Sequence, residues 1–133
     1  MVNARSLYGI HHPVGNKLLT RLRIGLSHLR SHKFTHKFQD TLNPFCPCTS
    51  NESETVEHNL LHCPKYIAQR RVLFETLIKF ISVVTFVNSK YICDLLLYGH
   101  SKYQWNTNKE IIKATIEFLI SSKRLDLSLI EGQ

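Results

Sequence analysis

One stretch of this chain concentrates the side chains that bind transition metals. In order along the chain, these side chains are Cys46, Cys48, His58, His62 and Cys63. Thiolates and imidazoles are the ligands of closed, tetrahedral zinc sites that stabilise small folds. Only one residue separates the first two cysteines, whereas zinc sites commonly have two to four. Three cysteines and two histidines so close together still predict one structural zinc ion within an irregular Cys/His corner.

The spacing of the last three side chains leaves the fourth ligand open. His58 and His62 are four residues apart, so a helix places both on one face, as in two-His zinc fingers. Cys63 lies about 500° around an α-helix from His58 and reaches the same ion only where the helix relaxes before Pro64. Helical geometry alone therefore favours His62 slightly over Cys63.

Apolar residues recur at helical spacing over most of the chain, which predicts a mainly α-helical, small domain. The expected helices are Lys17–His32, Ser53–His62, Pro64–Val83, Ser89–Tyr98, and a last helix from Thr107. Asn51 with Glu54, and Thr107 with Glu110, resemble capping boxes. Gly25 is expected inside the first helix and Gly99 at the end of the fourth. The irregular segment 33–50 is expected to be held down by Phe34, Phe38 and Phe45, and Cys93 to be a buried thiol.

Charge divides the 133 residues, which carry a net charge of +7, into unequal parts. The predicted divisions are a basic helix and loop flank (1–45), a Cys/His zinc-binding motif (46–64), a helical C-terminal region (65–126) and a frayed tail (127–133). The first 45 residues contain seven Lys or Arg and one Asp, whereas residues 49–63 contain three Glu and no Lys or Arg. A basic flank beside a Cys/His cluster indicates a polyanionic partner.

The expected partner is RNA or DNA, held through its phosphates with weak sequence preference. The candidate phosphate contacts are Arg21, Arg23, Arg30, Lys33 and Lys37. The neighbouring histidines, which add charge at lower pH, are His28, His32 and His36.

Catalysis is not expected, and no catalytic residue is assigned. The chain has no phosphate-binding glycine loop, dinucleotide-binding fingerprint or His-Glu-x-x-His motif, and its carboxylates are few and scattered. No small-molecule substrate or cofactor other than zinc is expected. No apolar run reaches the roughly 20 residues of a membrane span, and no secretory signal opens the chain. These features predict an intracellular protein, nuclear or cytoplasmic, without a membrane partner.

Three stretches of the sequence carry a family resemblance. Residues 18–25 (LLTRLRIG), the Cys46-x-Cys48 pair and residues 54–64 (ETVEHNLLHCP) resemble the zinc-binding region that follows the reverse transcriptase domain in non-LTR (LINE-type) retrotransposon polyproteins. Residues 97–99 and 114–124 are similar to the C-terminal end of such reading frames, so the resemblance covers nearly the whole chain.

The resemblance implies that Cys46, Cys48, His58 and Cys63 hold the zinc ion, with His62 as the alternate fourth ligand. It also implies a non-catalytic module that helps a reverse transcriptase domain to hold its RNA template or target DNA. The aromatic-x-Asp-Asp motif of the polymerase is absent, so the chain is expected to be a C-terminal fragment of a polyprotein.

The alternative interpretation is a structural or protein-interaction remnant without independent activity. In that case, exposed apolar residues would be former contacts with the polymerase, and the arginines beside the leucine stripe would cover the core rather than reach phosphate. The apolar residues in question are Leu7, Tyr8, Ile10 and Trp105.

Overall fold

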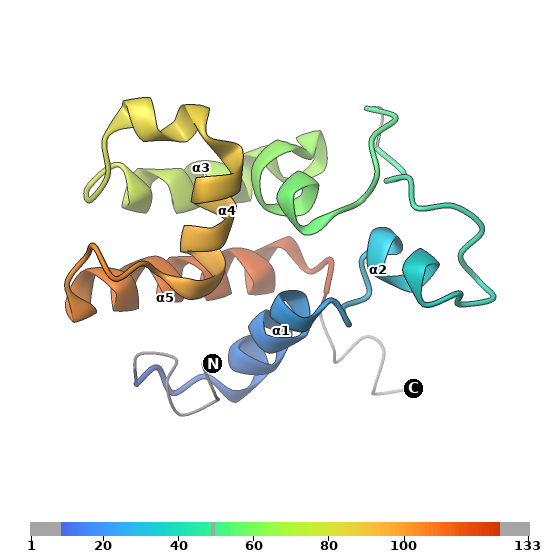
Figure 1. Ribbon diagram of the computed structural model, residues 1–133, viewed down its shortest axis with the longest axis horizontal. Coiled ribbons are helices and arrows are strands. Elements are labelled where there is room, and N and C mark those ends of the chain that lie inside the picture. Colours follow the sequence, from blue (N-terminus) through green and yellow to red (C-terminus); the bar gives the residue numbers. More distant parts are fainter. Residues whose placement is uncertain (1–8, 49, 126–133) are drawn as a thin grey trace.

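The computed structural model describes residues 9–48 and 50–125, and this part of the protein is mainly helical (Figure 1). The helices are α1 (Pro13–Ile24), α2 (Arg30–Thr35), the π-helix η2 (His58–His62), the 3₁₀-helix η3 (Pro64–Tyr66), α3 (Ile67–Leu77), the 3₁₀-helix η4 (Val83–Val87), α4 (Ser89–Tyr98) and α5 (Trp105–Ser122). Among the described residues, the one β pairing is an isolated bridge between Phe45 and Ser53. The predicted tail 127–133, like Leu7 and Tyr8, lies outside the described residues.

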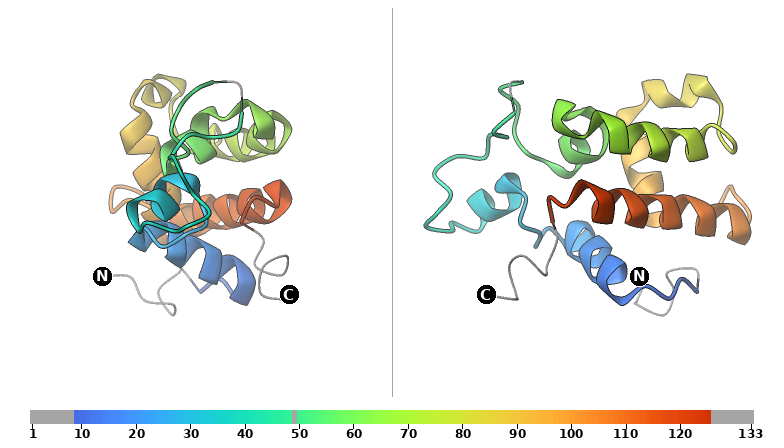
Figure 2. Two further views of the ribbon diagram at one scale, coloured as in Figure 1. Left: turned by 90° about the vertical axis from the view of Figure 1, so that its right-hand side faces the viewer. Right: turned by 180° about the vertical axis from the view of Figure 1, so that it is seen from behind.

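Helix α5 lies at the centre of the fold, between α3 on one side and α1 on the other (Figures 1 and 2). Helix α4 also packs against α5 and contacts α1. Gly15 allows α1 to approach α5 closely, because a Cβ atom at this position would lie 2.2 Å from Cγ2 of Ile116. Eight of the 18 residues of α5 are buried.

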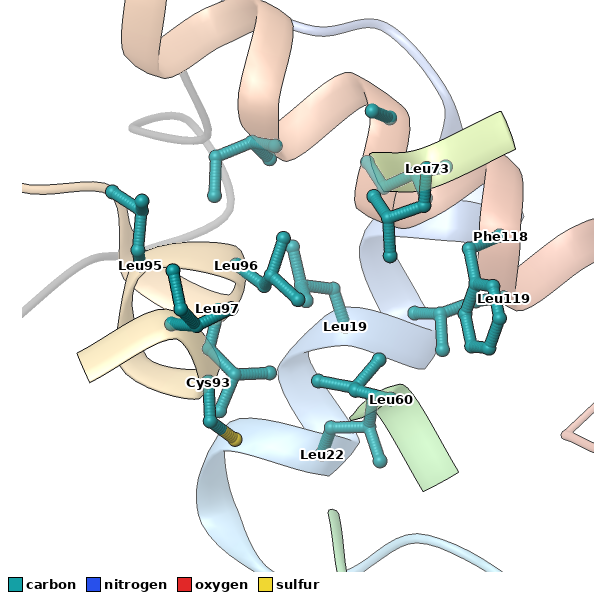
Figure 3. Packing of buried hydrophobic residues seen from close by; sticks show 14 of the residues in the cluster. Leu19, Leu22, Leu60, Leu73, Cys93, Leu95, Leu96, Leu97, Phe118 and Leu119 are labelled. Carbon is teal, nitrogen blue, oxygen red and sulfur yellow. The ribbon is translucent and has the colours of Figure 1, made fainter. Parts of the chain in front are cut away.

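One hydrophobic core joins these helices (Figure 3). Five elements each contribute a buried leucine to it: Leu19, Leu60, Leu73, Leu96 and Leu119. Burying a leucine side chain stabilises a fold by about 1.5–3 kcal/mol. Because Leu60 belongs to η2, this core also anchors the π-helix that carries part of the Cys/His cluster.

Cys93 lies in the same core and confirms the prediction of a buried thiol. Burial raises the pKa of this thiol to about 11. In the described part of the chain, no helix combines the length and the apolar character that a membrane crossing requires.

The predicted first helix is wrong at both ends. Helix α1 begins at Pro13, where His12 caps it by accepting a hydrogen bond from the Gly15 backbone N–H. It ends before Gly25, which adopts a left-handed conformation with φ of 75°. A glycine at this position terminates a helix at little cost, so Gly25 is a C-cap and not an interior residue.

Both predicted capping boxes are also wrong. Asn51 has a φ of 59° and does not begin a helix. Glu54 is buried and its carboxylate contacts Arg124 instead of a helix N-terminus. Helix α5 begins at Trp105, two residues before the predicted Thr107 cap. Helix α4 matches the predicted Ser89–Tyr98 range, and Gly99 ends it as expected.

Two further segments differ from their predictions. Helix α3 ends at Leu77 rather than at Val83. Phe34, Phe38 and Phe45 are about half exposed, so they do not hold the segment 33–50 against the core. Residues 30–35 of that segment form α2.

Candidate metal centre

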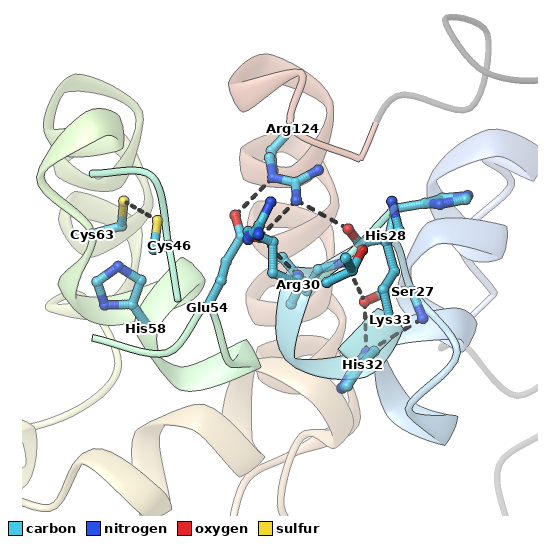
Figure 4. Close-up of polar contacts among 12 residues, drawn as sticks. Ser27, His28, Arg30, His32, Lys33, Cys46, Glu54, His58, Cys63 and Arg124 are labelled. Carbon is cyan, nitrogen blue, oxygen red and sulfur yellow. Dashed lines mark hydrogen bonds and ion pairs between the residues drawn. The ribbon is translucent and has the colours of Figure 1, made fainter. Parts of the chain in front are cut away.

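The structure brings Cys46, Cys48, His58 and Cys63 together as a possible metal site. One ligand atom from each residue lies within 4.8 Å of the others. Cys46, His58 and Cys63 are buried, whereas Cys48 is partly exposed. Figure 4 shows the side chains of Cys46, Cys63 and His58 converging from the loop and from the neighbouring helix.

A short antiparallel loop, residues 44–54, positions the first two cysteines; it is called the metal loop below. The Cys46 N–H donates to the Glu52 carbonyl at 2.8 Å, and the Glu54 N–H donates to the Pro44 carbonyl at 2.8 Å. These bonds bring the two arms of the loop together around Cys48. The chain bends at Pro47 and Cys48.

The π-helix η2 positions the other two ligands. In an α-helix, His58 and Cys63 would point in different directions, because each residue advances by about 100°. The backbone instead closes a wider turn, in which the Cys63 N–H donates to the His58 carbonyl at 2.7 Å. Cys63 itself has an extended conformation, with φ of −62° and ψ of 123°, directly before Pro64. The helix is therefore interrupted directly before Pro64, which is the condition under which Cys63 can reach the same ion as His58.

Arg70 on α3 stabilises this unusual turn. Its guanidinium group is buried and donates hydrogen bonds of 2.8, 2.9 and 2.8 Å to the carbonyls of Leu60, Asn59 and Cys63. These bonds satisfy carbonyls at the end of η2 that would otherwise lack a buried partner. No pattern in the sequence pointed to Arg70, since a single arginine on a predicted helix face is ordinary.

His62, the alternate ligand, lies outside the cluster. Its side chain is 43% exposed, and Nε2 lies 3.5 Å from Oε2 of Glu57. The preference for His62 assumed an α-helix, and η2 is a π-helix. The geometry therefore favours Cys63.

Two of the distances within the cluster are close to those of a tetrahedral zinc site. Sγ of Cys46 and Sγ of Cys63 are 3.7 Å apart, and Sγ of Cys48 lies 3.4 Å from Nε2 of His58. With zinc bonds of 2.3 Å to sulfur and 2.0–2.1 Å to nitrogen, a regular tetrahedron has edges of about 3.8 Å between sulfurs and about 3.6 Å between sulfur and nitrogen. The donor set of three thiols and one imidazole, with all four ligand atoms within 4.8 Å of one another, could therefore hold a metal ion.

Glu52 orients the histidine of this cluster. Its carboxylate oxygen Oε2 lies 2.8 Å from Nδ1 of His58 and accepts a hydrogen bond from it, which turns Nε2 toward Sγ of Cys48 as the nitrogen that would bind a metal. Carboxylates orient metal-bound histidines in this way in many proteins. Glu52 was not predicted as part of the site, because in the sequence it counts only toward the local negative charge.

The environment separates the acidities of two of the thiols. Burial raises the pKa of Cys46 to about 12. Hydrogen bonds from the hydroxyl and the backbone N–H of Ser50 lower the pKa of Cys48 to about 6, and the Ser50 Oγ atom lies 3.0 Å from Sγ. Without a metal, the cluster thus contains one readily formed thiolate beside a thiol that stays protonated.

The five candidate phosphate contacts lie in two parts of the fold, on α1 and around α2. Arg23 is engaged inside the fold, since Nε donates to the Leu97 carbonyl at 2.5 Å and the guanidinium lies over the Tyr98 ring. Arg21, also on α1, is partly buried. The other three, Arg30, Lys33 and Lys37, belong to α2 and the turn that follows it.

Within this second group, exposure differs. One Nη atom of Arg30 lies near the Asn43 carbonyl, and Lys33 pairs with Asp40 at 2.6 Å. Lys37 is exposed. Burial lowers the pKa of His32, whose Nδ1 faces the Ser27 hydroxyl at 2.6 Å, so His32 adds less charge at low pH than an exposed histidine would.

Comparison of the chain with protein-family models, with curated proteins and with solved structures finds no match.

Proposed function

We propose that this chain is a non-catalytic module that holds one structural zinc ion and binds RNA or DNA. The zinc ligands are Cys46, Cys48, His58 and Cys63. The geometry of this Cys₃His cluster carries the proposal, because four protein ligands leave no open position for a reactive water. The ion would fix the metal loop against η2.

Nucleic-acid binding is supported by where the charge lies. Arg30, Lys33 and Lys37 lie on α2 and its following turn, and Ser31 of α2 is tied to the metal loop by a hydrogen bond to the Glu54 carbonyl at 3.2 Å. Folding of the metal loop therefore fixes the segment that presents these cations. We further propose that the chain is related to the C-terminal region of a LINE-type reverse transcriptase, in which it would assist the polymerase domain.

A titration against nucleic acid tests the binding function. Zinc-loaded protein is mixed with labelled RNA, single-stranded DNA and duplex DNA at increasing salt. We expect affinity to fall steeply with salt, with a slope of about −0.7 per neutralised phosphate for single strands. Absence of binding to every probe at low salt would refute the proposal.

A second candidate function is a protein-interaction module, and exposed apolar side chains on two elements favour it. Val83, Val84 and Val87 on η4 are each more than 70% exposed, and Trp105 at the start of α5 is 55% exposed. Ile10, by contrast, packs partly against the core. Sedimentation that reveals self-association, together with no affinity for nucleic acid, would favour this second function.

A further inference from the structure

An aromatic surface with a lysine beside it lies on α2 and the turn that follows. It comprises Phe34, Lys37, Phe38 and Leu42, and is called the Phe34–Phe38 surface. Phe34 is 44% exposed, Phe38 is 49% exposed and Leu42 is 85% exposed. All four residues line one shallow hollow of about 550 Å³. Figure 1 shows α2 and the segment after it at the side of the helical body.

The end of α2 fixes the geometry of this surface. Lys37 adopts a left-handed conformation with φ of 59°. Its N–H donates to the Phe34 carbonyl, and the Phe38 N–H donates to the Lys33 carbonyl, both at 3.0 Å. These two bonds are typical of a helix C-terminus that ends in a left-handed residue, a position at which glycine is favoured. A lysine thus occupies a position where its side chain costs conformational energy.

The charge on this surface is positive. Asp40 is the one acidic residue between positions 28 and 48, and Lys33 pairs with it. Nζ of Lys33 also lies 5.8 Å from the centre of the Phe38 ring. Within the described residues, Lys37 is exposed and forms no ion pair. An exposed cation therefore stands beside two exposed rings.

We propose that the Phe34–Phe38 surface stacks the bases of single-stranded RNA or DNA while Lys37 contacts a backbone phosphate. This inference rests on the nucleic-acid-binding function proposed above and names its substrate class. Aromatic rings stack with any base, and only an unpaired strand offers free base faces. The adjoining positive charge favours a polyanion over an apolar protein partner.

The first experiment compares probes on the unaltered, zinc-loaded chain. Fluorescence anisotropy measures binding of an oligothymidylate of about 12 nucleotides, an abasic oligomer of the same length and a duplex. The abasic strand keeps every phosphate and loses every base face. We expect the oligothymidylate to bind about tenfold or more tightly than the abasic strand, since stacking contributes that much per base.

The second experiment changes the rings. Phe38→Ala should weaken oligothymidylate binding by about tenfold and leave abasic binding unchanged, whereas Phe38→Tyr should retain affinity because it keeps a ring. Circular dichroism and zinc content verify that each variant is folded. Because the probe comparison needs no variant, the proposal remains testable even where Phe38→Ala does not fold.

The third experiment changes the charge, with a matched control. Lys123 at the end of α5 has the same left-handed conformation, with φ of 58°, and is also exposed. Lys37→Gly should reduce the salt slope of single-strand binding by about 0.7, which corresponds to one phosphate contact. Lys123→Gly removes an equal charge from the same backbone conformation and should leave the slope unchanged.

The outcomes separate the two proposals. No binding of any probe would refute nucleic-acid binding as a whole. Equal affinity for the abasic strand and the oligothymidylate, with no effect of Phe38→Ala, would overturn the stacking inference and leave the general function standing. Self-association that Phe38→Ala abolishes would also overturn it, because a second copy of the chain would then cover this surface.

Discussion

Glu54 in the metal loop forms a bidentate ion pair with Arg124, which lies two residues beyond helix α5 (Figure 4). Nε of Arg124 lies 2.7 Å from Oε2 of Glu54, and Nη2 lies 2.6 Å from Oε1. The same carboxylate accepts a bond of 2.8 Å from the Arg30 N–H, and Arg124 also donates to the His28 carbonyl at 3.0 Å. One buried carboxylate therefore joins the metal loop, α2 and the end of the central helix.

Replacing this carboxylate is expected to destabilise the protein. Glu54 is 1% exposed, whereas the side chain of Arg124 is 24% exposed, so Glu54→Gln leaves a partly buried arginine without its counter-charge. Loss of one partner of a fully buried pair lowers the free energy of unfolding by about 3–5 kcal/mol. Because water reaches Arg124 in part, we expect a loss of about 2–3 kcal/mol. Glu57→Gln is the control, because Glu57 is 45% exposed and its pair with His62 is long; such pairs contribute about 0–1 kcal/mol. Urea denaturation measures both, and equal losses would contradict a structural role for the buried pair.

The metal ligands can be distinguished by single substitutions. Purified protein is expected to contain about one zinc ion per chain, and Cys63→Ser should lose it. His62→Ala should retain zinc, because His62 lies outside the cluster. Cys93→Ala is the matched thiol control, since Cys93 belongs to the core. Metal analysis after dialysis against a chelator gives the content of each; retention in Cys63→Ser with loss in His62→Ala would reverse the assignment.

Glu52 should act on the zinc ion through His58. Glu52→Gln keeps the size of the side chain but weakens its hydrogen bond to Nδ1. Substitution of such orienting carboxylates lowers metal affinity by about 10–100-fold. Competition with a chromophoric chelator measures this affinity. Glu57→Gln changes the net charge by the same amount, so an equal effect of both variants would point to general electrostatics instead.

Stability should decrease in mild acid because of His32. Burial lowers the pKa of His32 below 6.5, and the charge of His36 lowers it further. The unfolded chain, in which the pKa is near 6.5, therefore binds more protons than the folded chain as pH falls through that value. The contribution is present above this pH and is lost below it. Denaturation at pH 8 and pH 5 should show a smaller loss in His32→Gln than in the parent; identical losses would exclude His32 as the cause.

The sequence predicted the composition of the candidate site better than its geometry. The pattern of cysteines and histidines sufficed to place a metal cluster, because ligand chemistry restricts the residue types. Helical periodicity, however, assumes a uniform advance per residue, so it favoured His62 over Cys63. The wider turn of η2 is held by Arg70 on the next α-helix, which donates to the carbonyls of Asn59 and Cys63. Tertiary contacts of this kind leave no local pattern.

The difference between local patterns and tertiary contacts also explains which helices were predicted correctly. Helix α4 was predicted correctly because its apolar residues and Gly99 agree locally. The Asn51 capping box failed because the Glu54 carboxylate is used by Arg124, 70 residues away. Gly25 could be either an interior residue or a cap, and periodicity continued past it. The exposed phenylalanines were placed inside by composition alone, whereas the structure leaves them at the surface.

Lys37→Gly should stabilise the folded chain while it weakens binding to single strands. A non-glycine residue in the left-handed region costs about 1–2 kcal/mol, and the greater freedom of glycine in the unfolded chain offsets about 0.5–1 kcal/mol of that. A net gain of about 0.5–1 kcal/mol in the free energy of unfolding is expected for Lys37→Gly and equally for Lys123→Gly, since both lysines have φ near 60°. Urea denaturation measures the gain. Only Lys37→Gly should also lose affinity for single-stranded nucleic acid. A variant that is more stable but binds more weakly would show that Lys37 acts in recognition and not in folding. A loss of stability in Lys37→Gly would instead mean that its side chain makes a contact that supports the turn.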